Sequence, residues 1–148
     1  MIFSGACHCG DIAVTYATTQ AEPPLRACQC SFCRRHGAKT TSDSTGRLTI
    51  ELARPIAYYK FGARVADVIV CPKCGCYVAS SIEGPAGRVA TLNVVGAHIE
   101  ALRARGAEAI SYDDETAEAK RTRRLSKWTP ALIVVKTTNA ERVGAAYE

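Results

Sequence analysis

The sequence lacks the long apolar segments that membrane proteins and exported precursors carry. No stretch of the 148 residues approaches the ~18 consecutive apolar residues of a membrane-spanning helix. The opening residues, Met1 to Cys7, contain no basic region followed by an apolar core, so they do not resemble a secretory signal. Internal repeats and low-complexity segments are also absent. We therefore expect a cytoplasmic protein that has no membrane partner.

A strong charge bias is missing as well. The formal net charge is +5, which is compatible with an anionic small substrate or with weak nucleic-acid contact and does not choose between them. A chain of 148 residues has the size of one domain and buries about 68 to 70% of its unfolded surface, so a core forms without disulfides. We expect a single zinc-binding domain over residues 1–148, for the reasons that follow.

Cysteine is the residue that the sequence has in excess. A reducing cytoplasm favours metal ligands or catalytic thiols over disulfide bridges. The eight cysteines fall into a Cys-x-Cys pair, a Cys-x-Cys-x-x-Cys triplet and a Cys-x-x-Cys pair followed closely by one more cysteine. The two pairs together make four ligands, which suffice for a closed tetrahedral zinc site that links the amino terminus to the middle of the chain. These four residues are Cys7, Cys9, Cys71 and Cys74.

The triplet of Cys28, Cys30 and Cys33 then stands alone. On an extended backbone Cys28 and Cys30 share one face, and a tight turn after them brings Cys33 to the same place. Three thiolates without a fourth protein ligand are typical of a zinc site that keeps one coordination position open for chemistry. The sequence therefore predicts a second zinc of a different kind.

Cys76 leaves an alternative open. It follows Cys74 by two residues, so both side chains share one side of an extended strand. If Cys76 were an eighth ligand, both sites would be closed four-cysteine sites. We favour the open triplet, because closure requires Cys76 to bind a different metal from its neighbour Cys74. His8 lies between two ligands and is expected to point away from them.

Hydrophobic alternation and β-prone composition predict a mainly β chain. Polar residues 40–46 read as a loop, and helical character is confined to residues 97–127. There we expect one short helix that Gly106 ends and a second that begins near Ser111, Asp113 or Asp114 and ends before Pro130. The predicted strands lie within residues 12–16, 48–52, 56–62, 65–70, 77–82, 89–95 and 131–135.

With these motifs in view, the sequence resembles the glutathione-dependent formaldehyde-activating enzymes, a family grouped with centromere protein V. The resemblance covers residues 2–95 and is carried by four matching segments: Gly5–Gly10, Cys28–Gly37, Tyr59–Gly62 and Cys71–Gly75. It implies a β-tent fold of coiled antiparallel sheets. The residue pattern itself, outside the resemblance, adds a short helical insertion at 97–127 and a final strand and tail at 128–148. The resemblance also implies two zinc ions per chain, a structural one on the two cysteine pairs and a catalytic one on the triplet.

The resemblance further implies a carbon-sulfur lyase that condenses a glutathione-like thiol with a small aldehyde such as formaldehyde. Its partners would be these small molecules. Arg34 and Arg35 are candidates to bind the carboxylates of the thiol substrate, with solvated counter-charges as the equal alternative. His36 is a candidate proton shuttle, although a structural hydrogen-bond role is favoured. The chain departs from the family at Cys76 and in the charged, helical region from Ala97 onward.

Other sequence features have simpler interpretations. Tyr58, Tyr59 and Phe61 are expected in the core, and Trp128 is expected to anchor the insertion. The basic run Lys120–Arg124 is interpreted as a solvated surface rather than a phosphate-binding patch. The alternative function is a zinc-stabilised binding module for nucleic acid or a protein partner with both metals structural, and nucleic acid is not the partner we favour. A redox-active cysteine protein without an obligate second metal is a third hypothesis.

Overall fold

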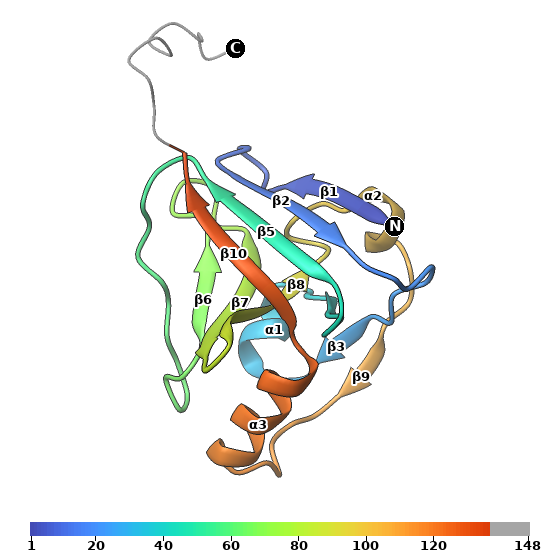
Figure 1. Cartoon of the computed structure of the whole chain (residues 1–148), viewed down its shortest axis with the longest axis vertical. Helices are drawn as coiled ribbons and strands as arrows, with labels where there is room; N and C mark the ends of the chain where they lie inside the picture. Colours follow the sequence, from blue (N-terminus) through green and yellow to red (C-terminus); the bar gives the residue numbers. More distant parts are fainter. Residues whose placement is uncertain (137–148) are drawn as a thin grey trace, which may run out of the picture.

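The computed structural model describes residues 1–136, so the last part of the predicted tail, residues 137–148, lies outside the described residues. Within this range the chain forms ten strands and three helices (Figure 1). The strands are β1 (Ile2–Ala6), β2 (Ile12–Ala17), β3 (Arg26–Cys28), β4 (Thr40–Thr41), β5 (Arg47–Leu52), β6 (Asp67–Val70), β7 (Tyr77–Gly84), β8 (Gly87–Asn93), β9 (Glu108–Ile110) and β10 (Thr129–Val135). The helices are α1 (Ser31–Arg35), α2 (Glu100–Arg103) and α3 (Ala117–Lys127). None of these three helices is long and apolar enough to span a bilayer.

The strands form two sheet regions that meet along β10 (Figure 1). Residues 131–135 of β10 run parallel to residues 48–52 of β5, which continues through β2 to β1. The first two residues of β10 pair instead with β8, which continues to β7 and β6 on one side and to β4, β3 and β9 on the other. The mainly β fold is confirmed. Its sheets are mixed rather than purely antiparallel, because β5 with β10 and β3 with β9 are parallel pairs.

The core lies between these sheets and follows the predicted alternation. The inward residues of β2 and β5 are all buried, and they are Ile12, Val14, Tyr16, Leu48, Ile50 and Leu52. They pack against buried residues of β7 and β8 such as Val78 and Leu92. Each fully buried aliphatic side chain contributes about 1.5 to 3 kcal/mol, so this alternation determines which face of each strand turns inward.

The segment at residues 56–62 is not the strand that its aromatic content predicted. Its backbone forms one isolated bridge, between Tyr59 and Val68. Tyr58 packs at the edge of the core, as expected, but Tyr59 and Phe61 are 51% and 38% exposed. The predicted loop at 40–46 contains a short strand, β4, that pairs with β8 through Thr40 and Thr41. Two to three residues carry no measurable period, so strands this short depend on tertiary pairing.

Residues 97–127 contain a strand as well as the two predicted helices. α2 ends at Arg103, before Gly106, and β9 then pairs parallel with β3, so this region is tied to the main sheet. α3 begins later than predicted, because its N-cap is Thr116, whose hydroxyl accepts a hydrogen bond from the Ala119 N–H at 3.1 Å. A further helix, α1, lies outside the region to which helical character was assigned.

Candidate metal centre

The two cysteine pairs lie on tight turns. Cys7 and Cys9 follow β1, and Cys71 and Cys74 follow β6. In each turn a glycine N–H donates a hydrogen bond to the carbonyl of the first cysteine. Gly10 donates to Cys7 at 3.0 Å, and Gly75 donates to Cys71 at 2.8 Å. Both glycines have a positive φ, 85° and 78°, which a residue without Cβ adopts at little cost. The glycines therefore shape both turns so that their cysteine side chains face one another.

The sulfurs of this four-cysteine site have the separations that a zinc ion requires. Those of Cys7, Cys9, Cys71 and Cys74 lie within 4.8 Å of one another. The Cys9 sulfur is 3.7 Å from that of Cys7 and 3.5 Å from that of Cys71. A tetrahedral zinc with bonds of about 2.3 Å holds its sulfurs about 3.8 Å apart. The donor set and its spacing fit a closed zinc site.

The surroundings of the four-cysteine site are consistent with bound metal. The Ile12 N–H donates a hydrogen bond to the Cys7 sulfur at 3.3 Å, as backbone amides do around metal-bound thiolates. Burial raises the pKa of the Cys7 thiol to about 12. Without a metal this thiol keeps its proton, so loading of the site must release protons.

The triplet is built at the junction of β3 and α1. Cys28 is the last residue of β3, Cys30 is the N-cap of α1, and Cys33 lies in the first turn of that helix. The Cys33 N–H donates to the Cys30 sulfur at 3.3 Å, so a cysteine takes the capping role that serine or aspartate usually fills. The tight turn expected after Cys30 is thus the start of a helix.

The three sulfurs of the triplet lie within 4.8 Å of one another. The hydrogen bond between the Cys33 and Cys28 thiols lowers the pKa of Cys28 to about 5 and raises that of Cys33. Within residues 1–136, no fourth cysteine, histidine or carboxylate joins them. Three thiolates fit a zinc ion with one position left for solvent or substrate.

Cys76 lies with the four-cysteine turn and not with the triplet. Its carbonyl accepts a hydrogen bond from the Cys71 N–H at 3.0 Å, and its thiol lies next to that of Cys74. Neither group of converging sulfurs includes it. The arrangement with Cys76 as the ligand that closes the triplet therefore has no geometric support.

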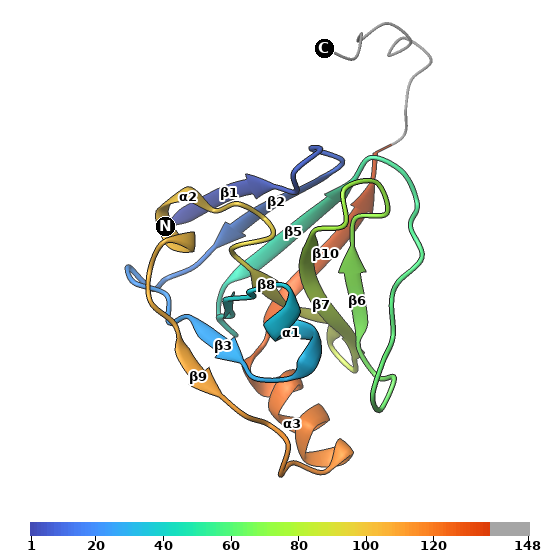
Figure 2. The ribbon, with the colours of Figure 1, turned by 180° about the vertical axis from the view of Figure 1, so that it is seen from behind.

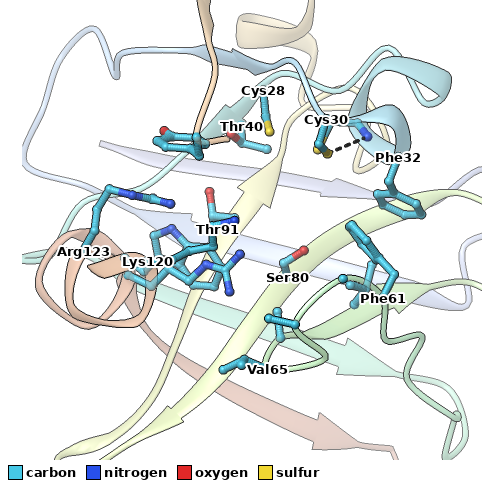
Figure 3. Close-up of a pocket in the computed structure, with 18 of the residues that line it drawn as sticks. Cys28, Cys30, Phe32, Thr40, Phe61, Val65, Ser80, Thr91, Lys120 and Arg123 are labelled. Carbon is cyan, nitrogen blue, oxygen red and sulfur yellow. Dashed lines mark hydrogen bonds between the residues drawn. The ribbon is translucent and has the colours of Figure 1, made fainter. Parts of the chain in front are cut away.

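The triplet forms part of the wall of a cavity of about 150 Å³ (Figure 3). An apolar wall comes from Phe32 of α1 together with Phe61 and Val68. Ser80 and Thr91, on β7 and β8, supply hydroxyl groups. The cysteine sulfurs lie on one side and α3 contributes a group of cations across the cavity from Phe61 (Figure 3).

An aromatic cluster supports the apolar wall. The ring of Phe32 lies 4.5 Å from that of His36, 5.1 Å from that of Phe61 and 4.9 Å from that of Tyr77. The Tyr77 hydroxyl bonds to Ser80 Oγ at 2.8 Å, and burial raises its pKa, so it keeps its proton at neutral pH. His36 packs within this cluster and does not line the cavity. This position matches a structural partner better than a proton shuttle.

Arg34 and Arg35 do not face the cavity. Both lie in the last turn of α1 and are exposed, and neither is among the lining residues. Their role as ligands for substrate carboxylates stays a prediction. The cations that do line the cavity are Arg26, Arg64, Lys120, Arg123 and Arg124.

The basic run on α3 was interpreted as a solvated surface, and for three of its members this is wrong. Lys120, Arg123 and Arg124 line the cavity, whereas Arg121 is exposed and donates to the Glu83 carbonyl at 3.3 Å. Lys120 and Arg124 are four residues apart and so lie on one face of the helix.

The next residue on that face of α3, Trp128, is 7% exposed and lies under the Arg124 guanidinium at 5.1 Å. It anchors the region, as predicted, and it also lines the cavity. The four-residue spacing of Lys120, Arg124 and Trp128 can be read from the sequence. The sequence does not show which part of the protein this face packs against.

The end of α3 is fixed to the sheet by two contacts. Leu125 fills the space above Gly84, where an added Cβ would lie 2.6 Å from its Cδ2. The hydroxyl of Thr129, which follows Trp128, accepts a hydrogen bond from the Asp43 N–H at 2.8 Å. Figure 2 shows the result, with α3 below α1 at the start of β10.

Comparison with known proteins agrees with this site. Residues 2–110 match the family described as glutathione-dependent formaldehyde-activating enzyme, which is more than half of the chain. The chain belongs to this family. The match includes both cysteine groups of this family member, extends past the expected end at 95 through α2 and β9, and stops before α3.

Structural comparison points to the same kind of fold. A crystal structure of a Rhodobacter sphaeroides protein, a structural genomics target, is 28% identical and has a TM-score of 0.54. The similarity covers 72% of this chain and 99% of the Rhodobacter sphaeroides chain. No curated protein matches the sequence.

Proposed function

We propose that this family member is a zinc-dependent enzyme of the carbon-sulfur lyase type that joins a glutathione-like thiol to formaldehyde or a similar small aldehyde. The observation that carries the proposal is the open triplet of Cys28, Cys30 and Cys33 on the wall of a cavity. A separate four-cysteine site serves the fold, so the triplet is available for chemistry. The proposal includes two zinc ions per chain.

The reaction balances without an oxidant or reductant. The thiol sulfur forms a bond to the carbonyl carbon of the aldehyde, and the carbonyl π pair moves onto oxygen. The proton that leaves sulfur ends on that oxygen, so the product is a hydroxymethyl thioether. Cleavage of the same carbon-sulfur bond in the reverse direction is the lyase reaction.

The cysteines of the triplet would hold the metal, and the rest of the cavity would position the substrates. When bound there, zinc supplies Lewis acidity, which lowers the pKa of a thiol or water in its open position. Phe32, Phe61 and Val68 exclude water from one side of the cavity. Because the hydroxyls of Tyr77 and Ser80 are hydrogen-bonded to each other, the pair has one O–H left to donate to the negative charge that develops on the aldehyde oxygen.

A cytoplasmic location belongs to the same proposal. All eight cysteines are free thiols in the structure, and thiol ligands of this kind persist where the surroundings are reducing.

The test is catalysed exchange of formaldehyde between free and glutathione-bound forms, measured by magnetisation transfer with ¹³C-formaldehyde. Wild-type protein with two zinc equivalents should exceed the uncatalysed exchange rate, and Cys30→Ser should abolish the excess. Cys76→Ser, which changes a cysteine outside both groups, is the matched control and should keep it. Zinc-loaded wild type that exchanges no faster than buffer would overturn the proposal.

A further inference from the structure

Two cations of α3, Lys120 and Arg124, face the cavity without a salt bridge to any described carboxylate. Arg123 is already neutralised, because its guanidinium binds Glu115 through contacts of 2.9 to 3.1 Å and lies over the Tyr112 ring at 3.7 Å. Within residues 1–136, Lys120 and Arg124 make no ion pair. Glu115 lies close enough to interact electrostatically with both, but its carboxylate is held by Arg123, so neither cation has a counter-ion in direct contact among the described residues.

Arg124 is the more unusual of the two. Its Nε is buried and has no hydrogen-bond partner, which is rare for a buried donor. Burial lowers its pKa, but arginine stays protonated in proteins, so a charged group is held in a partly desolvated position. The Trp128 ring covers one face of the guanidinium and leaves its N–H edge for another group.

We infer that Lys120 and Arg124 bind a carboxylate of the thiol substrate while its sulfur faces Cys28, Cys30 and Cys33. The substrate class is then a thiol that carries a carboxylate, to which glutathione also belongs. This inference rests on the proposed function. It places the specificity of the enzyme on a helix that follows the part of the chain matched to the family.

The chemistry of the two ends of the cavity supports this orientation. A guanidinium offers a planar fork of N–H donors that matches a carboxylate, and a lysine four residues away adds a second charge on the same helix face. A carboxylate has no comparable partner among Phe32, Phe61 and Val68 on the apolar wall. A thiol, in contrast, is the ligand type that suits a three-cysteine zinc site.

The cavity volume limits what is fully enclosed. A cavity of about 150 Å³ holds a ligand the size of benzene, which corresponds to about six non-hydrogen atoms. A short thiol acid such as 3-mercaptopropionate has this size. Glutathione would place one carboxylate and its thiol inside and extend the remainder towards solvent.

Lys120 and Arg124 have one alternative role, to offset the negative charge of the triplet. In that case a carboxylate ligand gains nothing over a neutral one of the same shape. The two roles are separated by ligands that lack a free thiol, since their binding does not depend on a bond to the metal. Suitable probes are 3-(methylthio)propionate and the matching amide, 3-(methylthio)propanamide.

The experiment is titration calorimetry of both probes on the full chain, with its metal content measured. Wild type should bind the carboxylate about 10- to 100-fold more tightly than the amide, which is the usual strength of a charged hydrogen bond. Arg124→Gln should reduce this ratio to about 3 or less, and Arg124→Lys should restore part of it. Lys127→Gln removes one charge from the exposed side of the same helix and should leave the ratio unchanged.

Arg124→Gln also removes a contact with Trp128, so circular dichroism must show that the variant is folded. Lys120→Gln is the second variant, and it should lower the ratio without disturbing that contact. Equal binding of both probes to wild type, or an unchanged ratio in folded Arg124→Gln and Lys120→Gln, would overturn the inference.

Failure of this inference can be told apart from failure of the proposed function. Catalysed glutathione and formaldehyde exchange with no carboxylate preference would leave the enzyme function standing and remove the subsite. A carboxylate preference that depends on Arg124, without any catalysed exchange, would support the anion subsite and overturn the proposed reaction.

Discussion

Both cysteine groups offer sulfur ligands, but they differ in how far apart these ligands lie in the sequence. The four-cysteine site joins residues that are far apart in the chain, since Cys9 and Cys71 are 62 positions apart. The triplet takes its ligands from six consecutive residues at one junction, from Cys28 to Cys33. A metal that closes a long loop constrains the whole fold, whereas a metal held by a short local segment constrains little beyond that segment. We therefore propose that the sequence separation between ligands distinguishes a structural from a functional site.

The sharpest test of this comparison is loss of a long-range ligand. Cys9→Ser should leave the protein unfolded at 25 °C, because the apparent binding free energy of a structural zinc is about 10 to 16 kcal/mol, as large as the stability of an entire domain. The measurement is thermal unfolding by circular dichroism, together with zinc analysis. A folded Cys9→Ser protein with the wild-type midpoint would contradict the structural role of this site.

The corresponding change in the triplet should spare the fold. Cys28→Ser is expected to lower the zinc content from two equivalents to one and to reduce catalysed exchange by roughly 100-fold or more. The protein should still unfold cooperatively, since the core around Ile50 and Leu92 does not include the triplet. Loss of both zinc equivalents together with the fold would remove the distinction between the sites and favour a binding module with two structural metals.

Metal removal should separate the sites without mutation. The open triplet lies on a cavity wall and has no fourth protein ligand within residues 1–136, so a chelator should take one zinc equivalent from it first. Catalysed exchange should fall with that first equivalent while the far-ultraviolet spectrum stays constant. The second equivalent should leave only with unfolding. Simultaneous loss of both equivalents would mean that the two sites have similar affinity.

The smallest effect is expected at Cys76. Cys76→Ala should keep two zinc equivalents and catalysed exchange, with a change in unfolding free energy of about 1 kcal/mol or less, because this partly buried thiol belongs to neither sulfur group. The measurement combines zinc analysis with urea unfolding. A drop in zinc content in this variant would show that Cys76 is a ligand after all.

The same difference in range explains what the sequence could predict. Both cysteine groups and the alternation of Ile12, Val14 and Tyr16 can be recognised from residue type and spacing. In the structure the sulfurs of each group converge, and these three side chains are buried. α1 was missed, because five residues carry no helical period and its cap is a cysteine. β9 was missed since its three residues are extended through their pairing with β3.

The cavity wall was the least predictable part. The spacing of Lys120 and Arg124 indicates a shared helix face, but the neighbours of that face depend on Leu125 meeting Gly84 and on Thr129 meeting Asp43. These contacts join residues more than 40 positions apart and leave no local pattern. The charge of Lys120–Arg124 alone therefore predicts a solvent-exposed surface, whereas three of these residues line a cavity.

The position of β10 also determines when, during synthesis, the pairing of the sheet can be completed. This strand lies between β5 and β8, and it is the last of the described strands to leave the ribosome. Until it emerges, the edge of β5 has no partner on that side, and pairings of such long range form slowly. The nascent chain thus presents an open strand edge, a known route to self-association, for most of its synthesis. Any shortening of the chain ahead of Thr129 would make that transient exposure permanent.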